Sequence, residues 1–312
     1  MNTKIIAVIL GITLLAAPVS YFYFGPFLTS AEFPILKMLM YVTLGASLLC
    51  FIVGELTNNN SQVDKLWSIL PIIYVWMVAA YGGFTIRLVL MAILVTIWGV
   101  RLTANFALKG AYHWKFWTGE EDYRWKVLRE KDEFKPHWKW MIFNLLFICL
   151  YQNVLILLFT LPSIIALQFA NTPISWIDYA ATALMLFFIA FETISDIQQR
   201  RFQTAKWSMI KAGQELPPMY KKGFLDRGLW SYSRHPNYFA EQAIWVSFYI
   251  FSIAAGAGIF NWTIIGSLLL IVLFQGSSAF GEEISSGKYP EYQAYQMRVS
   301  KIIPFFQKNA KE

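Results

Sequence analysis

The chain has 312 residues, of which 57% are apolar and only 14% charged, and its formal net charge is +7. Because a soluble domain carries about a quarter charged residues, this composition excludes an ordinary soluble globular protein. Its apolar stretches are continuous and about twenty residues long, as membrane-crossing helices require, whereas a membrane β-barrel shows alternation within shorter segments. We therefore predict an all-α integral membrane protein, a polytopic helical bundle.

Eight membrane spans are predicted within a single membrane domain that covers residues 1–312. In chain order they are 4–24, 34–54, 67–82, 87–106, 140–168, 177–194, 238–259 and 263–280. The third is short and the fifth is long, so the fifth is expected to be kinked or partly interfacial. The first is expected to be a retained helix and not a secretion signal, because its apolar stretch continues through bulky residues to Phe24.

Lys and Arg gather in alternate loops. The rich segments are 107–139, 195–237 and the tail after Gly281, with eight, eight and five of these residues. The loops expected on the opposite face contain none, so the positive-inside rule places both termini in the cytoplasm. This one-sided charge fits contact with anionic lipid or a phosphate-bearing cofactor. Nucleic acid is not an expected partner, because the basic residues are tied to membrane loops.

Cysteine and histidine give no sign of a metal centre. Cys50 and Cys149 both lie inside apolar spans, where a cysteine usually acts as a small buried hydrophobe. The chain has three His and no metal-ligand spacing or disulfide framework. We therefore predict no metal.

Two cytoplasmic segments have recognisable local patterns. Residues 119–133 mix acid and base at helical spacing, which is typical of an amphipathic helix at the membrane surface, although a direct site role stays open. The breakers Gly213, Pro217 and Gly223 predict a compact loop or short hairpin over the cytoplasmic mouth of the bundle.

The end of the sixth span carries a first polar constellation. Glu192, Asp196 and Arg200 are spaced four residues apart and therefore share one helix face. A carboxylate pair one turn from an Arg suits ribose hydroxyls, a carboxamide or a phosphate. The alternative is a helix end that returns to water, where the Arg caps the last carbonyls.

Residues 228–241 form the most informative segment, because they place Arg, His, Asn, Glu and Tyr against the start of an apolar helix. His235 precedes Pro236 and is forced out of helical geometry, while Pro236 suits the first turn of the seventh helix. Asn237 and Glu241 then lie one turn apart on one face. Arg234 and His235 lie at the helix start, which is a suitable anion site. A capped helix entry with a satisfied His is the structural alternative.

The remaining candidates lie in the tail and in the N-terminal half of the chain. In the tail, Tyr292 and Tyr295 are three residues apart and either sandwich a flat heterocycle or mark the lipid interface. Arg101 lies deep in the fourth span and is expected to contact a carboxylate or a ligand. Asp64 lies at the mouth of the third span.

These motifs resemble those of the steroid 5-alpha-reductase superfamily, most closely its bacterial branch of uncharacterised membrane proteins. The resemblance is carried by residues 228–239, 63–67, 98–102, 119–124 and 292–304. It runs from about residue 55 onwards, which makes residues 1–55 accessory helices and 56–312 a reductase-like core with a C-terminal cofactor half. Isoprenylcysteine carboxyl methyltransferases and sterol reductases share a related Arg-His-Pro-x-Tyr element.

The resemblance implies NADPH as the cofactor, bound from the cytoplasmic side. The carboxylate and amide residues would hold the nicotinamide and ribose region: Glu192, Asp196, Asn237 and Glu241. Basic residues and a tyrosine would serve the phosphates and the adenosine: Arg101, Lys109, Arg200, Arg234 and Tyr238. Tyr232 and His235 of the same motif are further cofactor-binding candidates. Tail residues would close the site: Glu283, Tyr292 and Tyr295.

The reductases place a carboxylate and a Tyr against the substrate carbonyl. The matching positions here are Asp64 and Trp98, which become the catalytic candidates. An indole donates one hydrogen bond but is a poor proton source, so this departure from the family pattern argues against steroid reduction itself. A Gly of the family pattern is replaced by Ala240.

We therefore predict an NADPH-dependent oxidoreductase of lipid metabolism, which reduces an activated carbon–carbon double bond in a lipid-like substrate from the bilayer. Its expected place is a bacterial inner membrane, with the cofactor site facing the cytoplasm. Two alternatives remain open: an S-adenosylmethionine-dependent membrane methyltransferase and a non-catalytic lipid-binding membrane protein.

Overall fold

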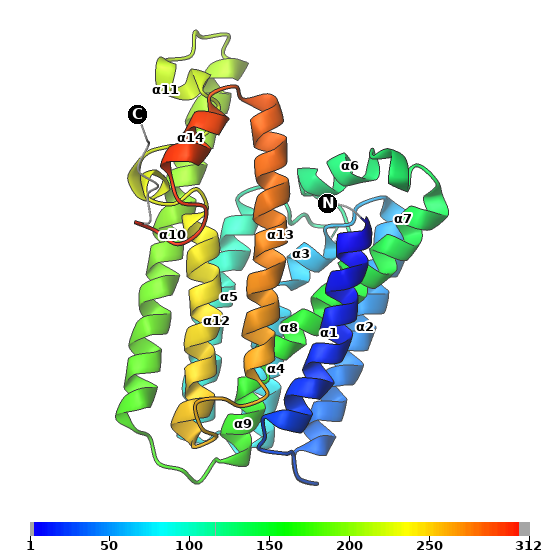
Figure 1. Ribbon diagram of the computed structural model, residues 1–312, viewed down its shortest axis with the longest axis vertical. Coiled ribbons are helices and arrows are strands. Elements are labelled where there is room, and N and C mark those ends of the chain that lie inside the picture. The colour runs from blue at the N-terminus through cyan, green and yellow to red at the C-terminus, as the bar shows by residue number, and fades with distance from the viewer. Residues whose placement is uncertain (1–2, 116, 306–312) are drawn as a thin grey trace. The chain divides into compact units, whose positions relative to one another are not determined.

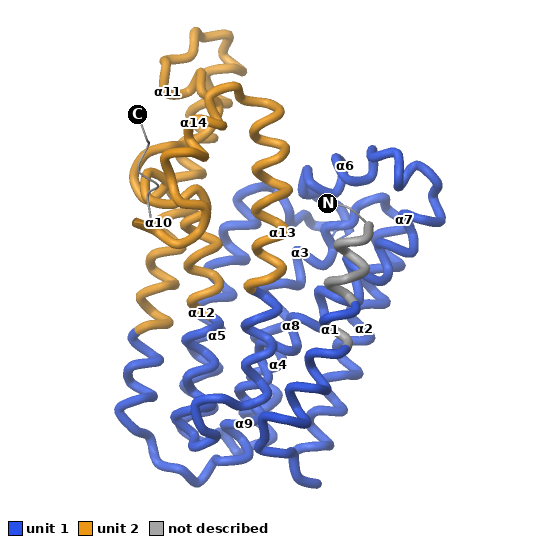
Figure 2. The backbone as a smooth tube through the Cα atoms, in the orientation of Figure 1, with its two compact units in different colours: residues 1–183, 245–270 blue, residues 184–244, 271–312 orange. Residues whose placement is uncertain are grey.

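The computed structural model describes residues 3–115 and 117–305, and within them the chain forms helices joined by loops, with no β-strand (Figure 1). This confirms the predicted all-α architecture of a polytopic membrane protein. The chain divides into two compact units (Figure 2). Unit 1 comprises Met1–Ala183 and Trp245–Leu270, and unit 2 comprises Leu184–Ile244 and Ile271–Glu312.

Unit 1 contains the N-terminal helices. They are α1 (Thr3–Tyr23), α2 (Phe33–Thr57), α3 (Gln62–Leu66), α4 (Leu70–Tyr81) and α5 (Ile86–Ala107). Its core is aromatic: the Trp98 and Trp245 ring centroids lie 4.9 Å apart, and those of Trp245 and Phe159 lie 4.0 Å apart. These rings fill the space between helices with side chains that need few polar partners.

The long fifth predicted span is a broken helix, as its length suggested. It consists of α7 (His137–Phe143), the π-helical segment η2 (Asn144–Tyr151), α8 (Gln152–Thr160) and α9 (Pro162–Gln168). The break before α9 follows from Pro162, which has no N–H for the preceding helix and begins a new one. The short third predicted span, 67–82, corresponds to α4, and the short helix α3 ends just before it.

The mixed-charge segment contains a short helix, α6 (Tyr123–Arg129), followed by a 3-10 turn η1 (Asp132–Phe134). Asp122 caps α6 by accepting a hydrogen bond of 2.9 Å from the backbone N–H of Arg124. The predicted surface helix is therefore present, and it covers only the middle of the segment.

Unit 2 is built on α10 (Trp176–Lys211), which begins in unit 1 and continues far beyond the predicted span 177–194. No Gly or Pro interrupts the chain before Gly213, so the helix continues through its polar turns. The other elements are α11 (Pro218–Lys221), η3 (Gly228–Ser231), α14 (Tyr292–Arg298), the start of α12 (Pro236–Ala255) and most of α13 (Ile264–Lys288).

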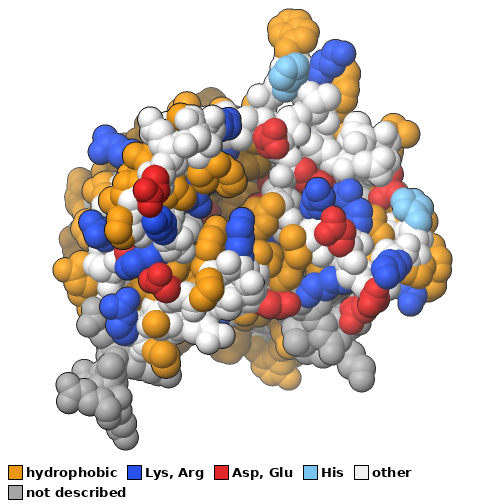
Figure 3. Space-filling model, turned by 90° about the horizontal axis from the view of Figure 1, so that it is seen from above, with side chains coloured by type: hydrophobic (Ala, Val, Ile, Leu, Met, Phe, Trp, Pro, Cys, Tyr) orange, Lys and Arg blue, Asp and Glu red, His pale blue; other side chains and the backbone are white. Residues whose placement is uncertain are grey.

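Six helical segments in the described residues are long and apolar enough to cross a membrane: Phe33–Thr57, Gln62–Tyr81, Ile86–Ala107, His137–Gln168, Trp176–Lys211 and Ile264–Lys288. The other two predicted spans are helical as α1 and α12. The count of eight crossings and the cytoplasmic termini stay predictions, as does the single-domain assignment. On the face shown in Figure 3, Lys and Arg side chains are interspersed with Asp and Glu.

Candidate functional site

The predicted site residues are divided between the two units. Unit 1 holds the catalytic candidates Asp64 and Trp98, together with Arg101 and Lys109. Unit 2 holds all the other predicted cofactor-binding residues. Lys109 is exposed, whereas Trp98 is fully buried in the aromatic core.

In unit 2, residues 228–241 are seated on α10. The backbone N–H of Leu229 donates to Gln198 Oε1 at 3.0 Å. Gly228 has φ +63°, and a Cβ there would come within 2.6 Å of Gln198 Oε1. The indole N–H of Trp230 donates to the carbonyl of Ser195 at 3.1 Å. Only glycine fits this turn without strain, which explains its place before the Arg-His-Pro element.

An acceptor-rich face is formed where α10 and the start of α12 meet in unit 2. Three carboxylates are buried there, with exposed fractions of 4% for Glu192, 9% for Asp196 and 4% for Glu241. Asn237 Nδ2 donates to Asp196 Oδ1 at 3.3 Å. Among the described residues, the buried Oδ1 of Asn237 has no hydrogen-bond donor. This contact therefore joins the two predicted polar faces, and it leaves the Oδ1 of Asn237 available as an acceptor.

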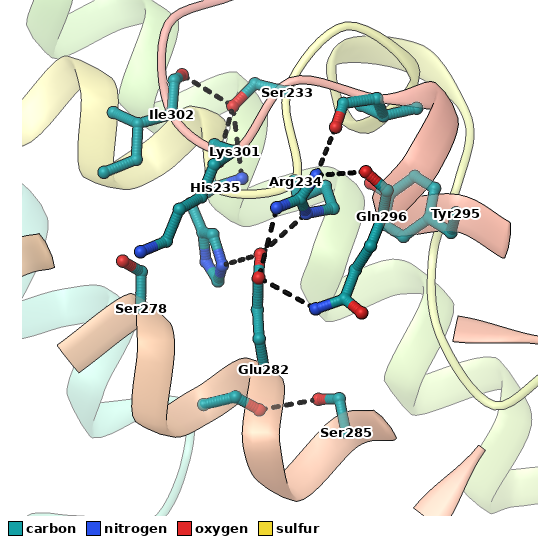
Figure 4. A network of polar contacts seen from close by, with 12 residues as sticks. Ser233, Arg234, His235, Ser278, Glu282, Ser285, Tyr295, Gln296, Lys301 and Ile302 are labelled. Atoms are coloured by element: carbon teal, nitrogen blue, oxygen red, sulfur yellow. Dashed lines mark hydrogen bonds and ion pairs between the residues drawn. The ribbon is translucent and has the colours of Figure 1, made fainter. Parts of the chain in front are cut away.

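Beside this face, Arg234 and His235 converge on Glu282 of α13 (Figure 4). Arg234 Nε and Nη2 lie 2.7 and 3.1 Å from the two oxygens of Glu282, and Nη1 donates to the carbonyls of Gln296 and Val299. The anion expected at this helix start is thus the protein's own carboxylate. Arg234 ties the motif to α13 and the tail, and its predicted phosphate-binding role stays a prediction.

His235 is engaged through one ring nitrogen. Its Nε2 lies 3.0 Å from Glu282 Oε1, and its ring stacks on Tyr238 with centroids 5.1 Å apart and an interplanar angle of 14°. Burial lowers the pKa of His235 below its usual value, although the Glu282 carboxylate acts in the opposite direction. The imidazole is therefore neutral at pH 7.

The chain tail binds back onto the same segment. Ser233 Oγ donates to the Ile302 carbonyl at 2.6 Å, and the N–H of Arg234 donates to the Ser300 carbonyl at 2.8 Å. Tyr292 and Tyr295 pack with Phe224 in a buried cluster.

The two tail tyrosines therefore face the core of unit 2, with only 5% and 2% of their surfaces exposed. The Tyr295 hydroxyl donates to the carbonyl of Trp230. Burial raises the pKa of Tyr295, which keeps the phenol protonated. Their expected contact with a heterocycle stays a prediction, while Glu283 and Tyr232 are exposed and Arg200 is half-buried.

In unit 1, Asp64 lies in a second polar cluster around α3. Its Oδ2 accepts a hydrogen bond of 2.9 Å from the indole N–H of Trp125 on α6. The neighbouring Lys65 Nζ donates to the carbonyl of Thr118 at 2.7 Å. The phenol of Tyr112 donates to the carbonyl of Lys65 at 2.8 Å. The loop after α5 and the surface helix are thus both attached to the segment that carries Asp64.

Sequence reasoning missed three partners in these networks: Glu282, Gln296 and Gln198. The sequence pattern pointed to Glu283, the neighbour of Glu282 in the chain. Adjacent residues on a helix point in different directions, and only the orientation of α13 shows that Glu282 meets the motif. Gln198 and Gln296 carried no signal beyond their place near charged neighbours.

Comparison with known proteins places the chain in a family. The profile described as "Protein of unknown function (DUF1295)" matches residues 50–299. The chain belongs to this family. The DUF1295 match includes every predicted site residue, from Asp64 to Tyr295.

A relative of this DUF1295 chain occurs in Schizosaccharomyces pombe. The fungal "Uncharacterized protein C594.04c" is 37% identical over 277 residues, which cover 82% of this chain and 78% of the relative. No solved structure matches the chain. Within residues 3–115 and 117–305, no group of three or more His, Cys, Asp or Glu is arranged to hold a metal ion.

Proposed function

We propose that this protein is a membrane-embedded, NADPH-dependent reductase of the steroid 5-alpha-reductase type, acting on an apolar substrate dissolved in the bilayer. The observation that carries the proposal is the acceptor-rich face in unit 2. Its buried amide oxygen, Asn237 Oδ1, has no hydrogen-bond donor among the described residues, and such an acceptor is expensive to desolvate unless a donor reaches it. Ribose hydroxyls and a carboxamide are donors of the required kind.

Asn237 gives the strongest support for a bound donor. An Asn amide has two orientations, related by a flip about the Cβ–Cγ bond, which exchange the positions of its oxygen and nitrogen. A neighbouring carboxylate decides between them, because it accepts a hydrogen bond only from the nitrogen. Asp196 accepts only, so it fixes Nδ2 on its own side and leaves Oδ1 as the remaining acceptor. A buried acceptor without a donor costs about 1–3 kcal/mol, which a ligand N–H or O–H would recover.

In this proposal Glu192, Asp196, Asn237 and Glu241 accept hydrogen bonds from the nicotinamide and ribose region. When bound, NADPH supplies a hydride for the double bond of the substrate. Asp64 is the proposed acid that stabilises charge developing on the substrate carbonyl, because such stabilisation is usually the largest catalytic contribution. The bacterial inner membrane and a cytoplasmic cofactor side belong to the proposal as well.

Thermal-shift binding to the purified full-length protein in detergent tests the proposal, with NADPH, NADH and S-adenosylmethionine at matched concentrations. NADPH is expected to raise the melting temperature and the other two are not. Stabilisation by S-adenosylmethionine alone would identify a methyltransferase instead. No shift with any of the three, on folded protein, would favour the non-catalytic lipid-binding protein.

Variants of the acceptor-rich face locate the site. Asn237→Ala and Glu241→Gln are expected to weaken NADPH binding at least tenfold, because each removes an acceptor from a buried site. Gln242→Ala is the matched control, since Gln242 is next to Glu241 but, among the described residues, donates to the Tyr238 carbonyl of its own helix and to no other group. Undiminished NADPH binding in both site variants would refute this placement of the cofactor.

A further inference from the structure

The ring of His235 is held on several sides and leaves one nitrogen available. Its Nε2 contacts Glu282 and its backbone N–H donates to Ser233 Oγ at 3.1 Å (Figure 4). Its face stacks on Tyr238. Its Nδ1 has no hydrogen-bond partner anywhere in the part of the chain that the structure describes. The side chain is 14% exposed, and Nδ1 is not among the fully buried polar atoms that lack a partner.

Glu282 determines which nitrogen carries the proton. A carboxylate only accepts hydrogen bonds, so a neutral His235 must present Nε2–H to it. The carboxylate is itself fixed by Arg234 and by Gln296, whose Nε2 donates to Glu282 Oε2 at 3.0 Å. With the proton on Nε2, the Nδ1 of the ring is a lone-pair acceptor.

The charged groups around the ring are few and come from three elements. Glu282 faces it from α13, Arg234 precedes it in the chain, and Lys301 approaches from the tail. Burial, Arg234 and Lys301 all disfavour the protonated imidazole, and Glu282 alone favours it. The neutral form and its Nε2–H tautomer therefore follow from the same set of neighbours.

We propose that Glu282 is a positioning residue that fixes His235 as the Nε2–H tautomer, and that His235 Nδ1 accepts a hydrogen bond from the bound cofactor. The ligand group is an N–H or O–H donor, such as a carboxamide or a ribose hydroxyl. The ligand half of this inference rests on the proposed function, and the tautomer half stands without it.

Nitrogen NMR on ¹⁵N-histidine-labelled full-length protein tests the tautomer. The chain has only three His, and His235→Gln identifies the signal of His235. We expect a protonated Nε2 and an unprotonated Nδ1 at pH 7.5. A signal from the Nδ1–H tautomer, or from a doubly protonated ring, would overturn the inference whatever ligand the protein binds.

Two amide replacements separate the two ring nitrogens in NADPH binding. Gln places its amide near the position of Nε2 and keeps the contact with Glu282, whereas Asn places its amide near Nδ1. We expect His235→Gln to retain the melting temperature and to weaken NADPH binding about tenfold, as the loss of one buried hydrogen bond does. His235→Asn should bind more tightly than His235→Gln, and the reverse order would overturn the role of Nδ1.

The pH profile separates positioning from simple structural support. NADPH affinity should decrease as the pH falls through the lowered pKa of His235, because protonation turns Nδ1 into a donor. His235→Gln gives the baseline that the cofactor phosphate produces by itself, since its second pKa is near 6.

In Glu282→Gln the decrease in NADPH affinity should occur at lower pH, because the group that favours protonation of His235 is lost. If Glu282→Gln bound NADPH more weakly at every pH but lost affinity at the same pH as the unchanged protein, Glu282 would have only a structural role. No binding of NADPH by the unchanged protein would overturn the proposed function and the ligand half of this inference, while the NMR result still decides the tautomer.

Discussion

Two buried arginine–carboxylate pairs, one in each unit, have nearly the same geometry. In unit 1, Arg87 Nε and Nη2 lie 2.7 and 3.1 Å from the two oxygens of Asp178. In unit 2, Arg234 Nε and Nη2 lie 2.7 and 3.1 Å from Glu282. Both arginines also donate to backbone carbonyls. The pairs differ in what else shares the carboxylate.

The additional partners of the Arg87–Asp178 pair are backbone groups and a serine hydroxyl, and none of them is titratable. Asp178 is fully buried and also accepts from the backbone N–H and hydroxyl of Ser175, while Arg87 donates to the carbonyls of Thr172, Pro173 and Ala254. Glu282 instead shares its oxygens with the titratable His235 and with Gln296. The same ion-pair geometry thus forms a structural lock in unit 1, and in unit 2 it holds a ring that still has an available nitrogen.

The largest expected effect is a loss of stability in Asp178→Ala. Removal of one partner leaves the guanidinium of Arg87 buried without its counter-charge, which costs about 3–5 kcal/mol. A melting temperature measured in detergent should fall steeply, while the NADPH affinity of the folded fraction stays unchanged. Glu282→Ala should destabilise less, because the Arg234–Glu282 pair is more exposed, at 9% and 8% against 3% and 0% for Arg87 and Asp178, and it should reduce NADPH affinity. Equal effects of the two variants on NADPH affinity would show that the two ion pairs do not differ in their relation to the cofactor site.

A double replacement serves as the control for this prediction. Arg87→Met combined with Asp178→Leu removes both charges and should regain much of the stability that Asp178→Ala loses, because apolar pairs often match buried ion pairs. No recovery would show that the carbonyl contacts of Arg87, and not its charge pairing, hold unit 1 together at this point.

An intermediate effect is expected at the glycine that precedes the motif in unit 2. Gly228 and Gly213 have nearly equal φ angles, +63° and +65°, but a Cβ at Gly213 would meet nothing within 4 Å. Gly213→Ala should therefore cost only the backbone strain, about 1–2 kcal/mol. Gly228→Ala should cost more and should also weaken NADPH binding, because its Cβ would displace Gln198. Thermal denaturation and NADPH titration of both variants measure the difference.

The smallest effect is the dependence of stability on pH. The pKa of His235 is lower in the folded protein than in the unfolded chain, so the unfolded chain takes up the proton first as the pH falls. Stability is therefore complete above about pH 6.5 and decreases as the pH falls through the lowered pKa, by less than about 1.4 kcal/mol per pH unit. Melting temperatures between pH 8 and pH 5 should show this decrease, and His235→Gln should reduce it. An unchanged profile in that variant would assign the dependence to other groups.

Periodicity and punctuation in the sequence were sufficient for the local structure. Continuous apolar runs predicted the helices, Pro162 accounts for the break in the fifth span, and Pro236 marks the first residue of α12. The four-residue spacings of Glu192 with Asp196 and of Asn237 with Glu241 correctly placed each pair on one face of a helix. These features depend on residues close together in the chain, so they can be read without the fold.

Which side chains meet across helices was decided only by tertiary structure. The sequence identified Arg234 and His235 as an anion site, and the fold placed Glu282, some fifty residues further along, in front of them. Likewise, only the fold shows that Tyr292 and Tyr295 pack with Phe224 in the core of unit 2. A helix fixes the direction of its side chains relative to its own axis, whereas its rotation against its neighbours depends on the packing of the whole unit. The sequence by itself therefore determined the helices and the chemistry on their faces, and the packing alone determined which carboxylate faces which cation.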